Sequence, residues 1–164
     1  MSNDFLSTYA AHVAERAALG IPPLPLSARQ TGEVIELLKS PPKGQEAALV
    51  ELITHRVPAG VDDAAKVKAS YLAAVAHGTE SCALISREHA TQLLGTMLGG
   101  YNISPLVDLL GDSSATVAQT AADGLKKTLL MFDQFHDVQE ILARVYSGKH
   151  LVTINSYVLY KIFL

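Results

Sequence analysis

Short breaks rich in proline and glycine divide this chain into segments whose apolar residues follow a helical spacing. The breaks include Pro22-Pro23, Pro41-Pro42 and Gly99-Gly100. Between them, apolar side chains recur three or four positions apart, which is typical of amphipathic helices. Because proline cannot continue a helix interior, each break limits the helix before it to a few turns. The pattern predicts an all-α chain of antiparallel helix pairs joined by tight turns, as an α-solenoid or an irregular bundle.

The helices expected from this pattern have recognisable ends. They cover residues 5–19, 28–40, 45–56, 63–77, 87–98, 104–110, 115–132 and 137–146. Ser27 and Gln30 fit a capping box, and Ser86 is another predicted cap. Asp62 or Asp63 is expected to cap the helix that ends at His77. Gly124 lies inside a predicted helix and should weaken it, unless packing requires another backbone to approach closely.

The size and composition of the chain predict one helical domain with a different C-terminal end. The 164 residues are about half apolar, and alanine and leucine favour closely packed helices. We expect a helical domain over residues 1–146 and an apolar tail over residues 147–164. Residues 152–164 favour β-structure, and Lys161 is their only charged residue.

No catalytic motif is recognisable in the sequence. The histidines lack a second ligand at metal-binding spacing; they are His12, His55, His77, His89, His136 and His150. A single thiol, that of Cys82, cannot form an internal disulfide or hold an iron–sulfur cluster. We therefore predict no catalytic, cofactor-binding or metal-binding residue in this chain. The N-terminus does not resemble a signal peptide and no segment is long enough to span a membrane, so we expect a cytoplasmic protein without a membrane partner.

Two groups of residues are candidates for binding. Gly99, Gly100, Tyr101 and Asn102 place two flexible residues, a ring and an amide at a helix junction, which suits a contact with a protein partner. The alternative is an ordinary helix–helix corner. Lysines at positions 66, 68, 126 and 127 form the second group.

These four lysines, Lys66, Lys68, Lys126 and Lys127, could form a basic face for RNA or for an acidic partner. The alternative is that they are solvated residues on helix surfaces, because the net charge of the chain is −3. The same net charge argues against a DNA partner.

Five stretches of the chain resemble the N-terminal HEAT-like domain of bacterial aconitase B. They are HVAERAALGIPPLPL, ELLKSPPKGQE, HRVPAGVDDAAKVKASYLAAVAHG, LLGTMLGGYNISPLVDLL and KKTLLMFDQFHDVQE. They occur in the family's order between about Tyr9 and Glu140, and their sequences most resemble those of cyanobacterial members. The resemblance implies a HEAT-like α-solenoid.

The resemblance also implies a function for the full-length enzyme. Aconitase B converts citrate to isocitrate through cis-aconitate in the tricarboxylic acid cycle, and its 4Fe–4S cluster and catalytic residues belong to later domains. The HEAT-like domain is associated with protein contacts, dimerisation and RNA binding. We therefore expect a non-catalytic interaction domain that self-associates or contacts the aconitase catalytic domains, with no activity alone.

After Glu140 the sequence departs from the family pattern, since it continues as ILARVYSGKHLVTINSYVLYKIFL. One hypothesis is a truncated or frameshifted aconitase gene whose tail is read-through. The competing hypothesis is a selected, stand-alone interaction module. Two further alternatives are one part of a split aconitate hydratase and a regulatory module that binds RNA.

Overall fold

A row of helices makes up the part of the chain that the structure describes. The computed structural model describes residues 2–98 and 100–128, and all structural statements refer to these. The elements are α1 (Ser2–Ala18), α2 (Ala28–Lys39), α3 (Glu46–Glu51), the π-helix η1 (Leu52–Arg56), α4 (Asp63–His77), α5 (Arg87–Leu94), α6 (Ile103–Leu109) and α7 (Ala115–Leu125).

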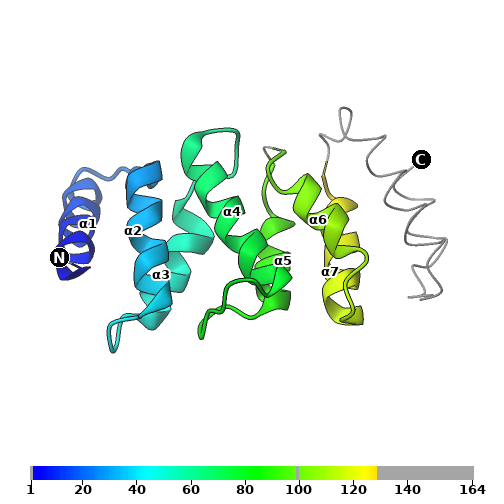
Figure 1. Cartoon of the computed structure of the whole chain (residues 1–164). Coiled ribbons are helices and arrows are strands. Elements are labelled where there is room, and N and C mark those ends of the chain that lie inside the picture. Colours follow the sequence, from blue (N-terminus) through cyan, green and yellow to red (C-terminus); the bar gives the residue numbers. More distant parts are fainter. Residues whose placement is uncertain (1, 99, 129–164) are drawn as a thin grey trace.

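Figure 1 shows that the helices follow one another along the row from α1 to α7, and α4 packs against both α2 and α5. No strand occurs among the described residues, so the all-α prediction is confirmed for them. The more specific HEAT-like solenoid remains a prediction.

The predicted starts of α2 and α4 are confirmed by hydrogen bonds at the caps, whereas α1 starts at Ser2 and not at the predicted residue 5. Ser27 Oγ accepts from the backbone N–H of Gln30 at 3.3 Å, and Gln30 Oε1 accepts from the backbone N–H of Ser27 at 2.9 Å. This is the complete capping box. At α4, Asp62 Oδ1 accepts from Ala65 N at 3.0 Å, so Asp62 is the cap and Asp63 is the first helical residue. These local bonds satisfy backbone groups that would otherwise lack partners.

Several predicted helix ends are wrong. The helix predicted to reach residue 98 ends at Leu94, after which the N–H of Thr96 and of Met97 bond three residues back to Leu93 O and Leu94 O. The helix predicted to continue to residue 132 ends at Leu125. The predicted helix over residues 137–146 and the tail over residues 147–164 lie outside the described residues.

Buried leucines from successive helices form one continuous core. Leu38, Leu72, Leu94 and Leu109 are fully buried and come from α2, α4, α5 and α6. Alanines and glycines let neighbouring helices approach closely. The expectation that Gly124 permits a close backbone approach is confirmed, because a Cβ built on it would lie 3.0 Å from the Cα of Gly95.

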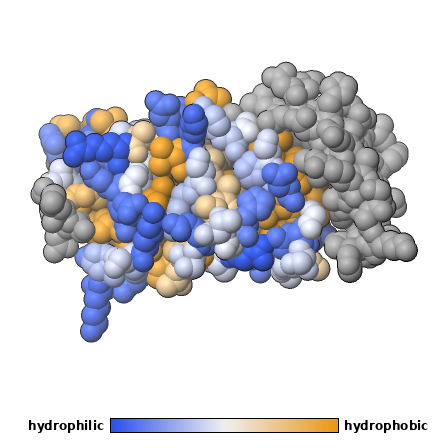
Figure 2. All heavy atoms as spheres, viewed as in Figure 1, coloured by the Kyte–Doolittle hydropathy of each residue, from blue (hydrophilic) through white to orange (hydrophobic). Residues whose placement is uncertain are grey.

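The large apolar side chains that are exposed lie along one edge of the row. Large apolar side chains that remain exposed all belong to the α1–α2, η1–α4 and α5–α6 connections; they are Leu19, Ile21, Leu24, Val61 and Leu98. Figure 1 shows these three connections on one side of the row, with the α2–α3 and α4–α5 connections on the other. Orange atoms on that same side are visible in Figure 2. We refer to the five residues as the apolar edge.

Candidate protein-contact surface

The predicted interaction corner, from Gly99 to Asn102, is held together by hydrogen bonds, of which those of Asn102 are buried. Asn102 is fully buried, and its Nδ2 donates to Leu94 O at 2.9 Å and to Met97 O at 3.0 Å. The hydroxyl of Tyr101 donates to Val61 O at 3.0 Å. Gly100 has a φ of 90°, which favours glycine, whereas Gly99 lies outside the described residues. Asn102 therefore fixes the shape of the corner from inside and presents no surface to a partner.

Two apolar residues that sequence reasoning missed are the exposed part of this corner. The side chain of Val61 is 71% exposed and that of Leu98 is 59% exposed. Their connections are joined, because Leu98 N donates to Ala59 O at 2.8 Å while Tyr101 bonds to Val61 O. Leu98 was expected inside a helix, where its exposure could not be foreseen. Val61 carried a weak signal, since it is an apolar residue between a glycine and a helix cap.

The four candidate lysines do not form one exposed face. Lys66 and Lys127 are exposed. Lys126 is partly buried, and its Nζ lies 2.8 Å from Asp123 Oδ1. Lys68 is only 2% exposed, so it cannot present its charge to a phosphate.

The buried ammonium of Lys68 stabilises the end of η1. Its Nζ donates to Thr54 O at 3.1 Å. Thr54 belongs to the last turn of this helical segment, where backbone carbonyls lack partners inside the helix and a positive charge is favourable. Burial in the protein lowers the pKa of Lys68 to about 8, because water no longer solvates the charged form.

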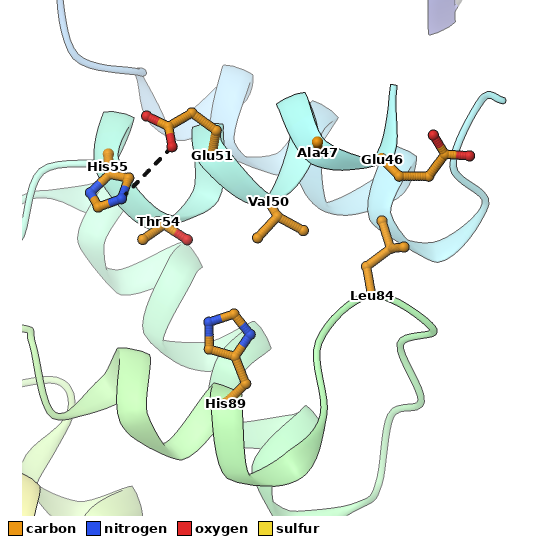
Figure 3. A pocket seen from close by; sticks show the side chains of 8 residues that line it. All are labelled: Glu46, Ala47, Val50, Glu51, Thr54, His55, Leu84 and His89. Atoms are coloured by element: carbon orange, nitrogen blue, oxygen red, sulfur yellow. Dashed lines mark ion pairs between the residues drawn. The ribbon is translucent and has the colours of Figure 1, made fainter. Parts of the chain in front are cut away.

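An open groove lies between the α3–η1 segment and the start of α5 (Figure 3). Its volume is about 530 Å³, and it is lined by Glu46, Ala47, Val50, Glu51, Thr54, His55, Leu84 and His89. Glu51 Oε2 lies 3.8 Å from His55 Nε2, and both side chains are largely exposed. Thr54 Oγ1 is buried and has no hydrogen-bond partner. We call this feature the α3–α5 groove.

The histidines of the described residues lie in three different places. His12 Nε2 accepts from the backbone N–H of Leu24 at 3.1 Å, which ties α1 to the proline-rich connection. His77 is in the last turn of α4, as expected. His55 and His89 line the α3–α5 groove, whereas His136 and His150 lie outside the described residues.

Within residues 2–98 and 100–128, no three or more His, Cys, Asp and Glu side chains are placed to hold a metal ion. Over the same part of the chain, every helix is too short or too polar to cross a membrane.

Comparison with known proteins places most of the chain in one family. The family model for the aconitate B N-terminal domain matches residues 8–157. Aconitate hydratase B of Pseudomonas aeruginosa is 57% identical over 135 residues, which cover 82% of this chain and 15% of that protein. The aconitate hydratase B proteins of Escherichia coli and Synechocystis are 56% and 53% identical, over 82% and 81% of this chain and 15% of each relative. The chain thus spans about 15% of the length of these relatives.

Two details of these matches bear on the sequence expectations. Identity to the Synechocystis protein does not exceed identity to the Pseudomonas and Escherichia proteins, so the expected similarity to cyanobacterial members in particular is not supported. The family match extends to residue 157 and includes residues 141–157, where the sequence was expected to depart from the family. That departure remains a prediction.

Proposed function

This chain belongs to the family of aconitate B N-terminal domains, and we propose that it is a non-catalytic domain that acts through protein contacts. The proposed partner is the catalytic remainder of an aconitase B, which would convert citrate to isocitrate through cis-aconitate. In the relatives, the matching region is followed or preceded by the other 85% of the protein, which supports a partner of this kind. The cytoplasm is the proposed location.

The cluster chemistry of such an enzyme must reside outside this chain. A 4Fe–4S cluster is held by three or four thiolates. Cys82 is the only cysteine of the chain, it is partly buried, and its Sγ donates to Leu38 O at 3.7 Å. One thiol does not fit such a cluster, so no catalytic step is assigned to the residues of this chain.

The observation that carries the proposal is the exposure of the apolar edge. Large aliphatic side chains gathered on one side of a protein mark contact surfaces, because water contact with apolar area costs free energy. Val61 and Leu98 are held in place by the hydrogen bonds of the corner, so they are presented on a fixed backbone. A partner that binds here would bury the apolar surface of both side chains, and binding would cost little free energy for ordering the backbone.

The test is co-purification of the full chain with separately expressed catalytic domains of an aconitase B. The double variant Val61→Asp/Leu98→Asp should lose most of the retained partner, since both residues are exposed and the fold should tolerate the change. Ser81→Asp/Ala83→Asp is the matched control, because both residues are exposed on the α4–α5 connection at the opposite edge. Equal retention of all three proteins would contradict the proposal.

Tyr101→Ala should also weaken retention with unchanged helicity, because Tyr101 anchors the backbone of Val61. Self-association is a second outcome that the same edge allows. Light scattering of the purified chain alone would then show a dimer that the Val61→Asp/Leu98→Asp variant dissociates.

The alternative is a split aconitate hydratase, in which this chain not only contacts the catalytic domains but is also needed for their full activity. If it is correct, adding the chain should raise the turnover of separately expressed catalytic domains, whereas simple contact would leave turnover unchanged. RNA binding is not favoured by any observation in the structure, because Lys68 is buried and Lys126 is paired with Asp123.

A further inference from the structure

We propose that the α3–α5 groove binds an extended, basic segment of a protein partner, with one Lys or Arg side chain lying along the groove. This surface is separate from the apolar edge, because it is formed by helix sides of α3, η1 and α5 and by Leu84. The apolar floor of the groove and the charge of its rim support this assignment.

The floor of the groove suits the aliphatic part of a long side chain. Figure 3 shows Ala47 and Val50 on one wall, with Leu84 and His89 facing them from the other. Lys and Arg bury their methylene groups along apolar surfaces while the charged end stays in a polar setting. A volume of about 530 Å³ is large enough for one such side chain and the adjoining backbone.

The rim of the groove is acidic and incompletely neutralised. Figure 3 shows Glu46 at one end of the groove and Glu51 toward the other. Within the described residues, Glu46 forms no ion pair, and Glu51 pairs only with His55, which is charged only when protonated. A cationic side chain between these carboxylates is therefore attracted, whereas the phosphates of an RNA would be repelled. The buried ammonium of Lys68 is not among the groups that line the groove.

The direct test is fluorescence anisotropy of the full chain with a labelled octapeptide in which Lys and Arg alternate with Leu and Ala. A peptide with Glu in place of each Lys and Arg is the ligand control. We expect saturable binding of the basic peptide at physiological salt and none of the acidic one. The double variant Glu46→Gln/Glu51→Gln should weaken binding about fivefold, since each exposed carboxylate contributes a modest attraction.

Two further variants separate the groove from general electrostatics. Ala47→Lys should abolish binding, because Ala47 is exposed and a lysine there would occupy the groove with its own ammonium. Glu15→Gln/Asp108→Asn removes the same two charges from exposed positions outside the groove and should bind normally. Absence of basic-peptide binding, equal binding of both peptides, or equal weakening in this control would overturn the proposal. None of these outcomes depends on retention of catalytic domains by the apolar edge.

Discussion

Glycines are closely packed where α5 meets α7, but a glycine of α2 that faces the space between α1 and α2 is not. A Cβ added to Gly95 would lie 2.9 Å from the Cα of Gly124, which is closer than real Cβ contacts. Gly32, in the middle of α2, has no atom beyond its own stretch of helix within 4 Å of the position that its Cβ would take. All three glycines are found in or next to helices, where glycine is unfavourable. Only Gly95 and Gly124 offset this cost, because they let α5 and α7 pack closely together.

The surroundings of the two positions differ in the same way. Leu94, Ala121 and Leu125 are fully buried where α5 meets α7. An open cavity of about 1110 Å³ lies between α1 and α2, and Gly32 is part of its lining. Of the described side chains of α1, only that of Tyr9 is buried in the core, and its hydroxyl accepts from Arg56 Nε at 3.0 Å. The comparison indicates that α1 opens at lower free energy than the α5–α7 region.

The largest expected effect is from adding a methyl group at the α5–α7 contact. Gly95→Ala and Gly124→Ala should each lower the free energy of unfolding by about 2 kcal/mol, because the new Cβ meets backbone that can move only if the helices separate. Chemical denaturation followed by circular dichroism measures this. An unchanged midpoint for both variants would show that the helices separate without cost, and the comparison would fail.

A smaller, pH-dependent effect should come from the buried cation of the central region. The pKa of Lys68 is about 8 in the folded chain and near 10.5 when unfolded, so the unfolded state binds more protons between these values. The free energy of unfolding should therefore rise with pH across this window, by about 2 kcal/mol between pH 8 and pH 10. Lys68→Met should remove this rise, whereas Lys66→Met should keep it, because Lys66 is exposed. Urea denaturation at several pH values measures the free energy of unfolding of each variant. If it depends on pH in the same way in both variants, the rise does not come from Lys68.

The smallest effect, and one of opposite sign, is expected at the α1–α2 junction. Gly32→Ala should raise the free energy of unfolding by about 0.5–1 kcal/mol, because alanine restricts the unfolded chain and its methyl group meets nothing. The same denaturation experiment applies. A loss of stability as large as that of Gly95→Ala would mean that α1 packs on α2 more tightly than the open cavity indicates.

Sequence reasoning succeeded where a feature depends on neighbouring residues. The capping box at Ser27, the cap near the start of α4 and the glycine after His77 are all local, since each bond spans only a few positions. It was less successful at the end of α5, because the residues after Leu94 continue an apolar pattern that a longer helix would also show. In the structure they turn so that Asn102 can bond to Leu94 O and Met97 O.

The candidate site was predicted only in part, for a related reason. The corner around Tyr101 and Asn102 was located, but its exposed residues, Val61 and Leu98, come from connections that meet only in the folded chain. Lys68 was grouped with Lys66 because they are close in sequence. One lysine faces the interior and the other faces solvent, since positions two apart on a helix point in different directions.

The sequence by itself determined the helical class and most helix starts, because caps, proline breaks and helical spacing act over short distances. The aconitate B N-terminal family was indicated by the resemblance of five stretches of the chain, and comparison with known proteins shows it. The tertiary structure alone decided which glycines are in close contact, which lysine loses its water and which apolar side chains remain exposed. Each of these depends on a neighbour that is remote in sequence: Gly95 on Gly124, Lys68 on Thr54, and Val61 on Tyr101. Close packing and desolvation arise only when such residues meet, so no local pattern records them.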